Sequence, residues 1–415
     1  MNINFLIKYV FGRLVTTGSL SVTTSNNKQF DFGDRTGQPV AIRFTDWKAE
    51  LGFILDPDLK LGENFVDQRM VMDAGTIYDF LALVLNGQRF VLAPLPVRIL
   101  NRWRYATRRF LQKNGMTKSR ENVAHHYDID DRIYQLFLDE DRQYSCAYFE
   151  YDEQSLDEAQ LAKKRHIAAK LCLKAGQKVL DIGSGWGGMA LYLARVAKVA
   201  SVLGVTLSKE QLGVAQGRAK KAGLAEDVQF ELQDYRDLNS KFERIVSVGM
   251  FEHVGIDFYD VFFNKTAELL TDDGVMLLHT IGNSDVPDFT NPWIVKYIFP
   301  GGHIPSMSDI LLSVERSKLI VTDVEVLRLH YAKTLRHWRE RFMARRSEAV
   351  ALYDEQFCRI WEFYLSASET AFQYEDIVIF QLQIAKRQEN VPLTRDYIGV
   401  AEAELRQVEA RVKSV

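Results

Sequence analysis

A glycine-rich segment, VLDIGSGWGG at residues 179–188, has the composition of a ligand-binding loop. Glycines directly after an apolar run allow a tight turn and let the backbone approach a ligand at a helix N-terminus. Proteins that bind NAD, FAD or S-adenosylmethionine use related loops, and a purely structural turn is the other alternative. Asp181 stands two residues before Gly183. An acid at this place can face a cationic cofactor, which favours S-adenosylmethionine over a pyrophosphate.

The next apolar run supports the same choice. It ends in GVTLS at residues 204–208 and lacks the acid that dinucleotide folds place about 20 residues after the glycines. Ser208 then begins a run with helical spacing and is a candidate N-cap. We therefore expect a strand before the glycine loop and a helix after it, followed by a second strand and a second helix that begins at Ser208.

From residue 177 onward, apolar runs alternate with segments of helical spacing. The runs that predict strands are KVLDIGSG, SVLGVTLS, VQFELQD, RIVSVGMFEHVG, GVMLLHTIG, VTDVEVLRL and IVIFQLQIA. Such alternation is typical of an open parallel sheet covered by helices. The predicted fold class is α/β, a Rossmann-like seven-stranded and mostly parallel sheet with helices on both faces.

The N-terminal part of the chain has a different pattern. Residues 1–14 are apolar but contain Lys8 and Arg13, which favours an amphipathic helix over a signal peptide. Alternation over residues 18–60, including LGFILDP, predicts strands, and residues 76–112 are helical in spacing. We predict a small α+β domain over 1–95, a basic helical linker over 96–120 and the α/β domain over 121–415.

The linker is strongly basic. Between Val97 and Arg120 it has eight basic residues and no acid, with apolar side chains interleaved. A solvated helix is one interpretation. The other is a helix that meets an anionic membrane surface, where each cation contributes about 1 kcal/mol.

Composition excludes several classes of protein. The chain has 415 residues with 52 Lys and Arg against 55 Asp and Glu, so it is no polycation for nucleic acid. Its three cysteines form no C-x-x-C pair, which argues against a disulfide framework, against a cysteine-rich metal site and for a reducing cytoplasm. No apolar run is long enough for a membrane-spanning helix.

Eight segments together resemble the cyclopropane-fatty-acyl-phospholipid synthase family of class I S-adenosylmethionine-dependent methyltransferases. In chain order they are ENVAHHYDI, YSCAYF, VLDIGSGWGG, GVTLSKEQ, QDYRDL, MFEHVG, LLHTIG and HYAKTL. The resemblance extends from Glu121 to the C-terminus and more loosely to LGENFVDQRM in the N-terminal domain.

The resemblance implies a set of residues that contact S-adenosylmethionine. They are Tyr144, Ser145, Asp181, Gly183, Gly185, Thr206, Gln211, Gln233 and Asp234. Ser184 departs from the cysteine that many members have, and we expect little consequence because the side chain stays small. For Thr206 and Gln211, ordinary helix capping is the alternative.

The resemblance also implies that a bound bicarbonate ion, rather than a side chain, acts as the base. The matching residues are Cys146, Glu252, His279, Ile281 and Tyr331. Glu252 follows the fourth predicted strand, His279 lies near the end of the fifth and Tyr331 follows the sixth. They should meet at the carboxyl edge of the sheet, where ligands of open α/β folds bind. Each residue alone could instead be an ordinary core side chain.

The implied reaction adds a methylene to the cis double bond of an unsaturated phospholipid acyl chain in a dry, aromatic-lined tunnel. A homodimer at the inner face of the membrane is the implied assembly, with the N-terminal domain contacting lipid. Two other enzymes stay open, a C-methyltransferase that makes methyl-branched fatty acids and a small-amine N-methyltransferase. A non-enzymatic lipid-binding protein is a further alternative.

Overall fold

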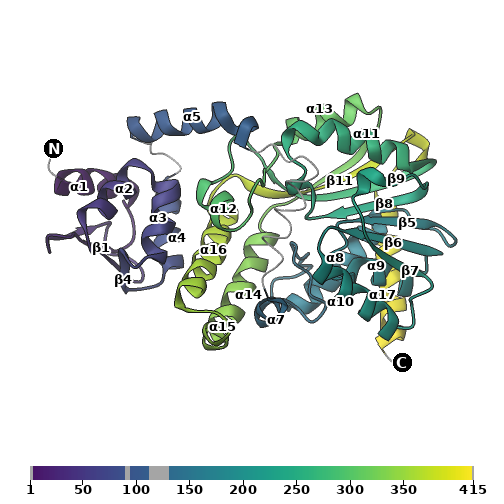
Figure 1. Ribbon diagram of the computed structural model, residues 1–415, viewed down its shortest axis with the longest axis horizontal. Helices are drawn as coiled ribbons and strands as arrows, with labels where there is room; N and C mark the ends of the chain where they lie inside the picture. The colour runs from purple at the N-terminus through teal and green to yellow at the C-terminus, as the bar shows by residue number, and fades with distance from the viewer. Residues whose placement is uncertain (1–2, 89–93, 112–129, 414–415) are drawn as a thin grey trace. The chain divides into compact units, whose positions relative to one another are not determined.

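A computed structural model describes residues 3–88, 94–111 and 130–413 (Figure 1). Within this part the chain forms two compact units. The N-terminal unit combines the chain up to Leu111 with residues 289–300 and 335–376. The second unit, which we call the sheet unit because it holds the larger sheet, contains the described residues 130–288, 301–334 and 377–413. The motif ENVAHHYDI and the basic residues Lys113, Lys118 and Arg120 lie outside the described residues. The division into domains 1–95, 96–120 and 121–415 stays a prediction.

The sheet unit is built on seven described strands in the order β10-β11-β9-β8-β5-β6-β7. The strands are β5 (Lys178–Ile182), β6 (Ser201–Thr206), β7 (Val228–Leu232), β8 (Phe242–Val248), β9 (Leu270–Asn283), β10 (Ile320–Leu327) and β11 (Ile377–Ala385). Strand β11 is antiparallel to both of its neighbours, and the pairs from β9 to β7 are parallel. The predicted fold class is confirmed.

Helices cover both faces of this sheet. One face packs against α8 (Leu156–Lys170), α9 (Gly188–Arg195), α10 (Lys209–Lys221) and α17 (Asp396–Lys413), and the other against α11 (Tyr259–Leu269) and α13 (Met307–Arg316) (Figure 1). Successive residues of β9 alternate between the two cores: Leu277 packs with the first group and Leu278 with the second. The chemistry-bearing residues at the end of β9 are therefore held by a strand that is buried on both sides.

Helix α8 differs from an ordinary surface helix because its polar residues are buried. It begins with a capping box in which Ser155 and Glu158 satisfy each other's backbone N–H groups. Its buried polar side chains are Gln160, Lys163, Lys164, Arg165, His166 and Lys170. Buried cations require partners, and the partners of this helix lie in strands β10 and β11, on α17 and in the segment 141–150.

The N-terminal unit contains a four-stranded sheet in the order β2-β1-β3-β4. Its strands are β1 (Leu20–Thr23), β2 (Gln29–Phe32), β3 (Val40–Phe44) and β4 (Met70–Ala74), and its N-terminal helices are α1 (Ile3–Leu14), α4 (Ile77–Gln88) and α5 (Leu95–Leu111). Helices α12 (Pro292–Tyr297), α15 (Arg346–Leu352), α16 (Glu355–Tyr374) and most of α14 (His330–Ala344) also belong to it. α16 packs on α3 (Pro57–Val66) and α4.

One predicted strand in this unit is wrong. LGFILDP, expected to continue the strand pattern, forms the end of helix α2 (Trp47–Leu55) and the start of α3. The Asp46 side chain accepts the N–H groups of Lys48 and Ala49 and so caps α2. Ala49 and Phe53, four residues apart, are buried on one face of the helix. The short apolar run is compatible with either a strand or a helix, and the N-cap at Asp46 favours the helix.

Candidate active site

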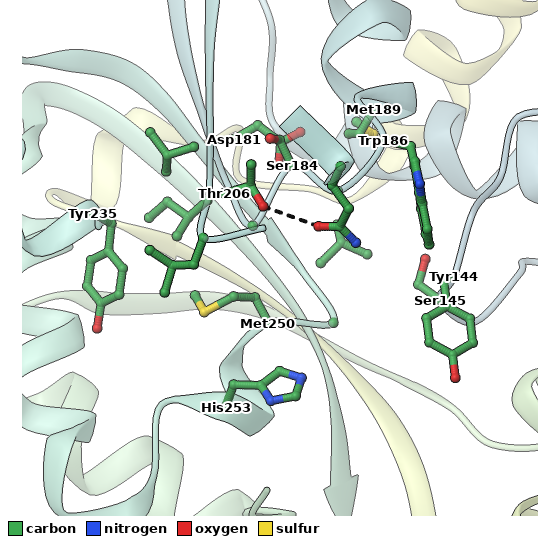
Figure 2. A pocket seen from close by; sticks show the side chains of 18 of the residues that line it. Tyr144, Ser145, Asp181, Ser184, Trp186, Met189, Thr206, Tyr235, Met250 and His253 are labelled. Atoms are coloured by element: carbon green, nitrogen blue, oxygen red, sulfur yellow. Dashed lines mark hydrogen bonds between the residues drawn. The ribbon is translucent and has the colours of Figure 1, made fainter. Parts of the chain in front are cut away.

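A cavity, which we call the glycine-loop cavity, lies at the carboxyl ends of β5, β6 and β8. All nine residues predicted to contact the cofactor line it: Tyr144, Ser145, Asp181, Gly183, Gly185, Thr206, Gln211, Gln233 and Asp234. Gln143 also lines the cavity and was not predicted to do so, nor were the residues Trp186, Met189, Tyr235, Met250 and His253 that Figure 2 labels. The sequence does not distinguish these side chains from others of the same types, so only their positions in the fold identify them.

The glycine loop makes a turn that other residues would strain. Gly183 has φ +83°, and a Cβ there would lie 2.7 Å from the Cβ of Met250. The N–H groups of Gly183 and Ser184 both donate to the carbonyl oxygen of Val205, at 2.9 and 3.0 Å. The loop is thereby fastened to the end of β6, and its open side forms part of the cavity wall.

Asp181 supplies an unsatisfied acid to this cavity. Its side chain is buried, and Oδ2 has no hydrogen-bond partner among the described residues. Burial raises the pKa of Asp181 to about 7, and the Lys163 ammonium acts in the opposite direction. A buried carboxylate of this kind is stabilised by a cation or a strong donor. The cavity therefore fits a positively charged ligand such as S-adenosylmethionine.

Polar side chains on the β6 and β7 sides are already ordered. Thr206 donates to Oε1 of Gln211 at 3.2 Å and accepts the N–H of Ser208 (Figure 2). Asp234 accepts two hydrogen bonds from the Arg236 guanidinium, at 2.8 and 2.6 Å. Ser208 also caps α10, as its sequence position predicted. These bonds fix the side chains before any ligand arrives.

Lys163 holds the segment that carries Tyr144 and Ser145. Its Nζ donates to Oγ of Ser145 and to Oε1 of Gln143, each at 2.7 Å. Burial lowers the pKa of Lys163 to about 8, an effect that the Asp139 carboxylate partly opposes. From the sequence alone, Lys163 cannot be distinguished from a solvent-exposed lysine, because its role depends on the burial of α8.

Of the five predicted catalytic residues, His279 and Ile281 lie on β9, and Glu252 bonds to this strand. Glu252 lies in a short 3-10 turn (Phe251–His253) after β8, and its Oε1 accepts the N–H of Ile281 at 2.6 Å. His279 Nδ1 is 3.1 Å from Nε2 of Gln381 on β11. Among the described residues, Glu252 Oε2 and His279 Nε2 have no hydrogen-bond partner. Two buried polar atoms, one on the turn after β8 and one on β9, are thus left unsatisfied.

The electrostatics of these two side chains follow from their burial. Burial raises the pKa of Glu252 to about 6, and the Ile281 N–H partly opposes this by stabilising the carboxylate. Burial also lowers the pKa of His279 well below its usual value, and the charges of Lys163 and Lys170 add to the effect. At neutral pH Glu252 is therefore mainly a carboxylate and His279 a neutral imidazole.

Cys146 and Tyr331 lie in two segments that bond to each other. The N–H of Ala147 donates to Thr334 Oγ1 at 3.0 Å, and the N–H of Phe149 donates to His330 Nδ1 at 2.9 Å. The Cys146 thiol donates to the carbonyl oxygen of Ala147, and burial raises its pKa. A thiol in this state is not a nucleophile. None of the five residues lines the glycine-loop cavity itself, although Ser145 and His253 beside them do.

The family model of mycolic acid cyclopropane synthetases matches residues 114–382. The chain belongs to this family. It is also 46% identical over 265 residues to the cyclopropane-fatty-acyl-phospholipid synthase of Escherichia coli (strain K12), a match that covers 64% of this chain and 68% of that protein. A probable fatty acid methyltransferase of Pseudomonas putida is 41% identical over 273 residues, or 64% and 69% of the two chains.

Solved structures agree with this family. The cyclopropane synthase MmaA2 from Mycobacterium tuberculosis is 34% identical with a TM-score of 0.61, covering 64% of this chain and 98% of that chain. The mycolic acid cyclopropane synthase CmaA1 in complex with SAH and CTAB is 35% identical with a TM-score of 0.60, covering 64% and 97%. The predicted family is confirmed, and the chain is an S-adenosylmethionine-dependent methyltransferase.

Proposed function

We propose that the enzyme transfers a methylene from S-adenosylmethionine to the cis double bond of an unsaturated phospholipid acyl chain and closes a cyclopropane ring. The two unsatisfied buried atoms, Glu252 Oε2 and His279 Nε2, are the observation that carries this proposal. Ring closure requires a base, because a proton must leave the added carbon after the new bond has formed.

The residues of the glycine-loop cavity would hold S-adenosylmethionine. When bound, S-adenosylmethionine supplies an electrophilic methyl group on a sulfonium. The Asp181 carboxylate would balance a positive charge, and the main chain at Gly183 allows close approach. Lys163 fixes Ser145 and Gln143 on the opposite wall. These residues orient the ligand, and orientation is what a weak alkene nucleophile requires.

We propose that bicarbonate binds at Glu252 and His279, where it would supply the base for the departing proton. His279 would donate to it through Nε2, and Glu252 Oε2 would accept its hydroxyl. The Ile281 N–H, which the family resemblance assigns to the ion, already donates to Glu252. We therefore give Ile281 the role of holding the carboxylate. Cys146 and Tyr331 complete the proposed set of residues around the ion. Cys146 would contribute a small, buried side chain to the lining of this site.

Exclusion of water is the third requirement, because water would convert a substrate carbocation into an alcohol. Glu252 is 9% exposed and His279 is 1% exposed. Phe251, Tyr259 and Phe263 belong to the hydrophobic core on the α11 face of the sheet. No individual aromatic ring receives a catalytic role.

We further propose that helix α5 brings the enzyme to anionic membrane surfaces. Leu95, Ile99 and Trp103 recur every four residues along it and are 66%, 62% and 60% exposed. Arg98 and Arg102 are exposed beside them. An apolar stripe flanked by cations suits the boundary between headgroups and acyl chains. In the described residues no helix combines the length and apolar character needed to cross a bilayer.

Arg104 on the same helix has a different role. It forms an ion pair with Asp56 at 2.8 Å within the N-terminal unit and is largely buried.

The proposed location of the enzyme is the cytoplasmic face of the membrane. The proposed assembly is a homodimer, which light scattering of the purified protein measures directly.

The deciding experiment incubates the enzyme with S-adenosylmethionine labelled in its methyl group and vesicles of unsaturated anionic phospholipid. We expect labelled fatty acids with one added methylene and no remaining double bond. Branched saturated or unsaturated products would instead establish a C-methyltransferase, the activity that the name of the Pseudomonas putida relative states. Label in an amine with none in the acyl chains would overturn the proposal.

A further inference from the structure

A buried polar chain links His279 to helix α8 through strand β11. Gln381 lies opposite His279 in the paired strands β11 and β9. Its Oε1 accepts a hydrogen bond from Nζ of Lys170 at 2.9 Å, and its Nε2 lies 3.1 Å from Nδ1 of His279. Lys170 and Gln381 are 0% exposed and His279 is 1% exposed. Water therefore does not compete for these bonds.

The chemistry of Lys170 fixes the orientation of the Gln381 amide. A lysine ammonium has donors and no acceptor, so the amide oxygen must face it. The Glu325 carboxylate also accepts from Lys170, and interactions with His166 and Lys170 outweigh its own burial to lower its pKa to about 2. Glu325 is thus ionised, and its charge opposes the effect of burial, which lowers the pKa of Lys170. The amide NH₂ is left facing His279.

The orientation of the amide in turn fixes the proton on His279. The NH₂ of Gln381 can only donate, so Nδ1 must accept and carries no proton. Burial keeps the ring neutral, as its lowered pKa indicates. A neutral imidazole has one N–H, which must then be on Nε2. This is the atom without a described partner.

We propose that Gln381 and Lys170 are positioning residues that hold His279 as the Nε2–H tautomer, so that it presents a donor to an anionic ligand. The proposal deepens the proposed function and rests on it, because the donor needs an anion such as bicarbonate to be useful. In the other tautomer, the Nε2 lone pair would face the oxygens of the ion and repel them. Helix α8 and strand β11 thereby act on the reaction without touching the substrate.

The first test reads the tautomer in the unmodified protein. Nitrogen-15 labelling of histidine gives two-bond proton–nitrogen spectra that distinguish protonated from unprotonated ring nitrogens, and a His279→Gln variant assigns the His279 signals. We expect an unprotonated Nδ1 and a protonated Nε2 at neutral pH. A protonated Nδ1 would overturn the proposal, whatever the enzyme does to lipid.

The second test removes the amide. Gln381→Met keeps length and apolar bulk but cannot donate, so we expect both tautomers in the spectrum. We also expect a fall in kcat of about 10- to 100-fold, the range seen for residues that orient a functional group, with an unchanged KM for S-adenosylmethionine. Retention of one tautomer and of kcat would overturn the positioning role.

Gln383→Met is the matched control. Gln383 is a buried glutamine two residues further along β11 that bonds to Tyr397 and to the main chain of Lys170 rather than to His279. We expect this variant to keep the Nε2–H tautomer and most of kcat. An equal loss of kcat in both variants would point to general disruption and against the proposal. A correct tautomer in an enzyme that makes no ring product would refute the proposed function alone.

Discussion

The main-chain N–H of Ile281 donates a 2.6 Å hydrogen bond to Oε1 of Glu252. This bond joins the turn after β8 to the end of β9 and fixes one oxygen of the carboxylate. The other oxygen, Oε2, remains without a partner among the described residues, as does Nε2 of His279. A buried acceptor and a buried ring nitrogen are thus both without a partner in the part of the chain that the structure describes.

The first prediction concerns the acceptor. Glu252→Gln keeps the shape of the side chain and an oxygen for the Ile281 N–H, but it places a donor where Oε2 now accepts. We expect ring formation to fall by about 100-fold or more, as when one preorganised polar group is removed from an active site. His279→Ala should have a similar effect.

Calorimetric titration supplies the control for both variants. The affinity for S-adenosylmethionine should stay close to wild type, because neither side chain lines the glycine-loop cavity. Substantial ring formation by either variant would remove its residue from the proposed site.

The second prediction concerns the pH dependence of cofactor binding. The pKa of Asp181 is raised to about 7, so the side chain is largely protonated at pH 6. A bound cation favours the ionised form and lowers this pKa. Binding should therefore release a proton at pH 6, and the dissociation constant should increase by up to about tenfold per pH unit as the pH falls below 7.

Titrations in buffers of different ionisation enthalpy measure the released proton. Asp181→Asn should weaken binding and abolish the pH dependence. Glu231→Gln, an exposed change at the end of β7, should retain both the affinity and the pH dependence. If wild type and Asp181→Asn share one pH profile, Asp181 does not face the charge of the cofactor.

The third prediction compares two glycines with the same backbone conformation. Gly183 has φ +83° and Gly176 has φ +85°, but a Cβ at Gly176 would meet no atom within 4 Å. Alanine at either position should cost about 1–2 kcal/mol of unfolding free energy for its left-handed conformation. Gly183→Ala should cost more, because its Cβ would also displace Met250.

Chemical denaturation and cofactor titration measure the two effects separately. Gly183→Ala should weaken S-adenosylmethionine binding by about tenfold or more, equivalent to 1.4 kcal/mol, whereas Gly176→Ala should bind normally. Equal affinities for the two variants would mean that the loop at Gly183 does not need a close approach.

The fourth prediction tests the exposed stripe of α5. Burial of an apolar side chain contributes about 1.5–3 kcal/mol, so replacing both Ile99 and Trp103 by serine should weaken binding to anionic vesicles by at least about tenfold. Raising the salt concentration should also weaken binding, because Arg98 and Arg102 lose their attraction. Vesicle sedimentation measures both effects.

Leu393→Ser is the control for the vesicle experiment. Leu393 is wholly exposed but lies in the sheet unit and outside α5. Its replacement should leave vesicle binding unchanged. Unchanged binding by the Ile99 and Trp103 variant would instead refute the membrane role of this helix.

The sequence by itself determined the sheet and the cofactor cavity. Parallel strands are buried on both faces and therefore appear as continuous apolar runs, such as KVLDI and GVMLLHTIG. The glycine loop and Asp181 can be recognised from the sequence, because a backbone with positive φ requires glycine and a buried acid beside a ligand requires a particular residue type. The apolar run LGFILDP is compatible with a strand or a helix, and the N-cap at Asp46 favours the helix that the structure contains.

Tertiary structure alone decided the environment of the candidate base site. Lys163 and Lys170 appear in the sequence as ordinary helical lysines, yet both are buried and bonded to residues far along the chain. The Ile281 N–H likewise could serve an ion or a side chain until its partner was placed. Hydrogen bonds act over about 3 Å, so residues separated by a hundred positions interact only after the sheet and its helices have assembled.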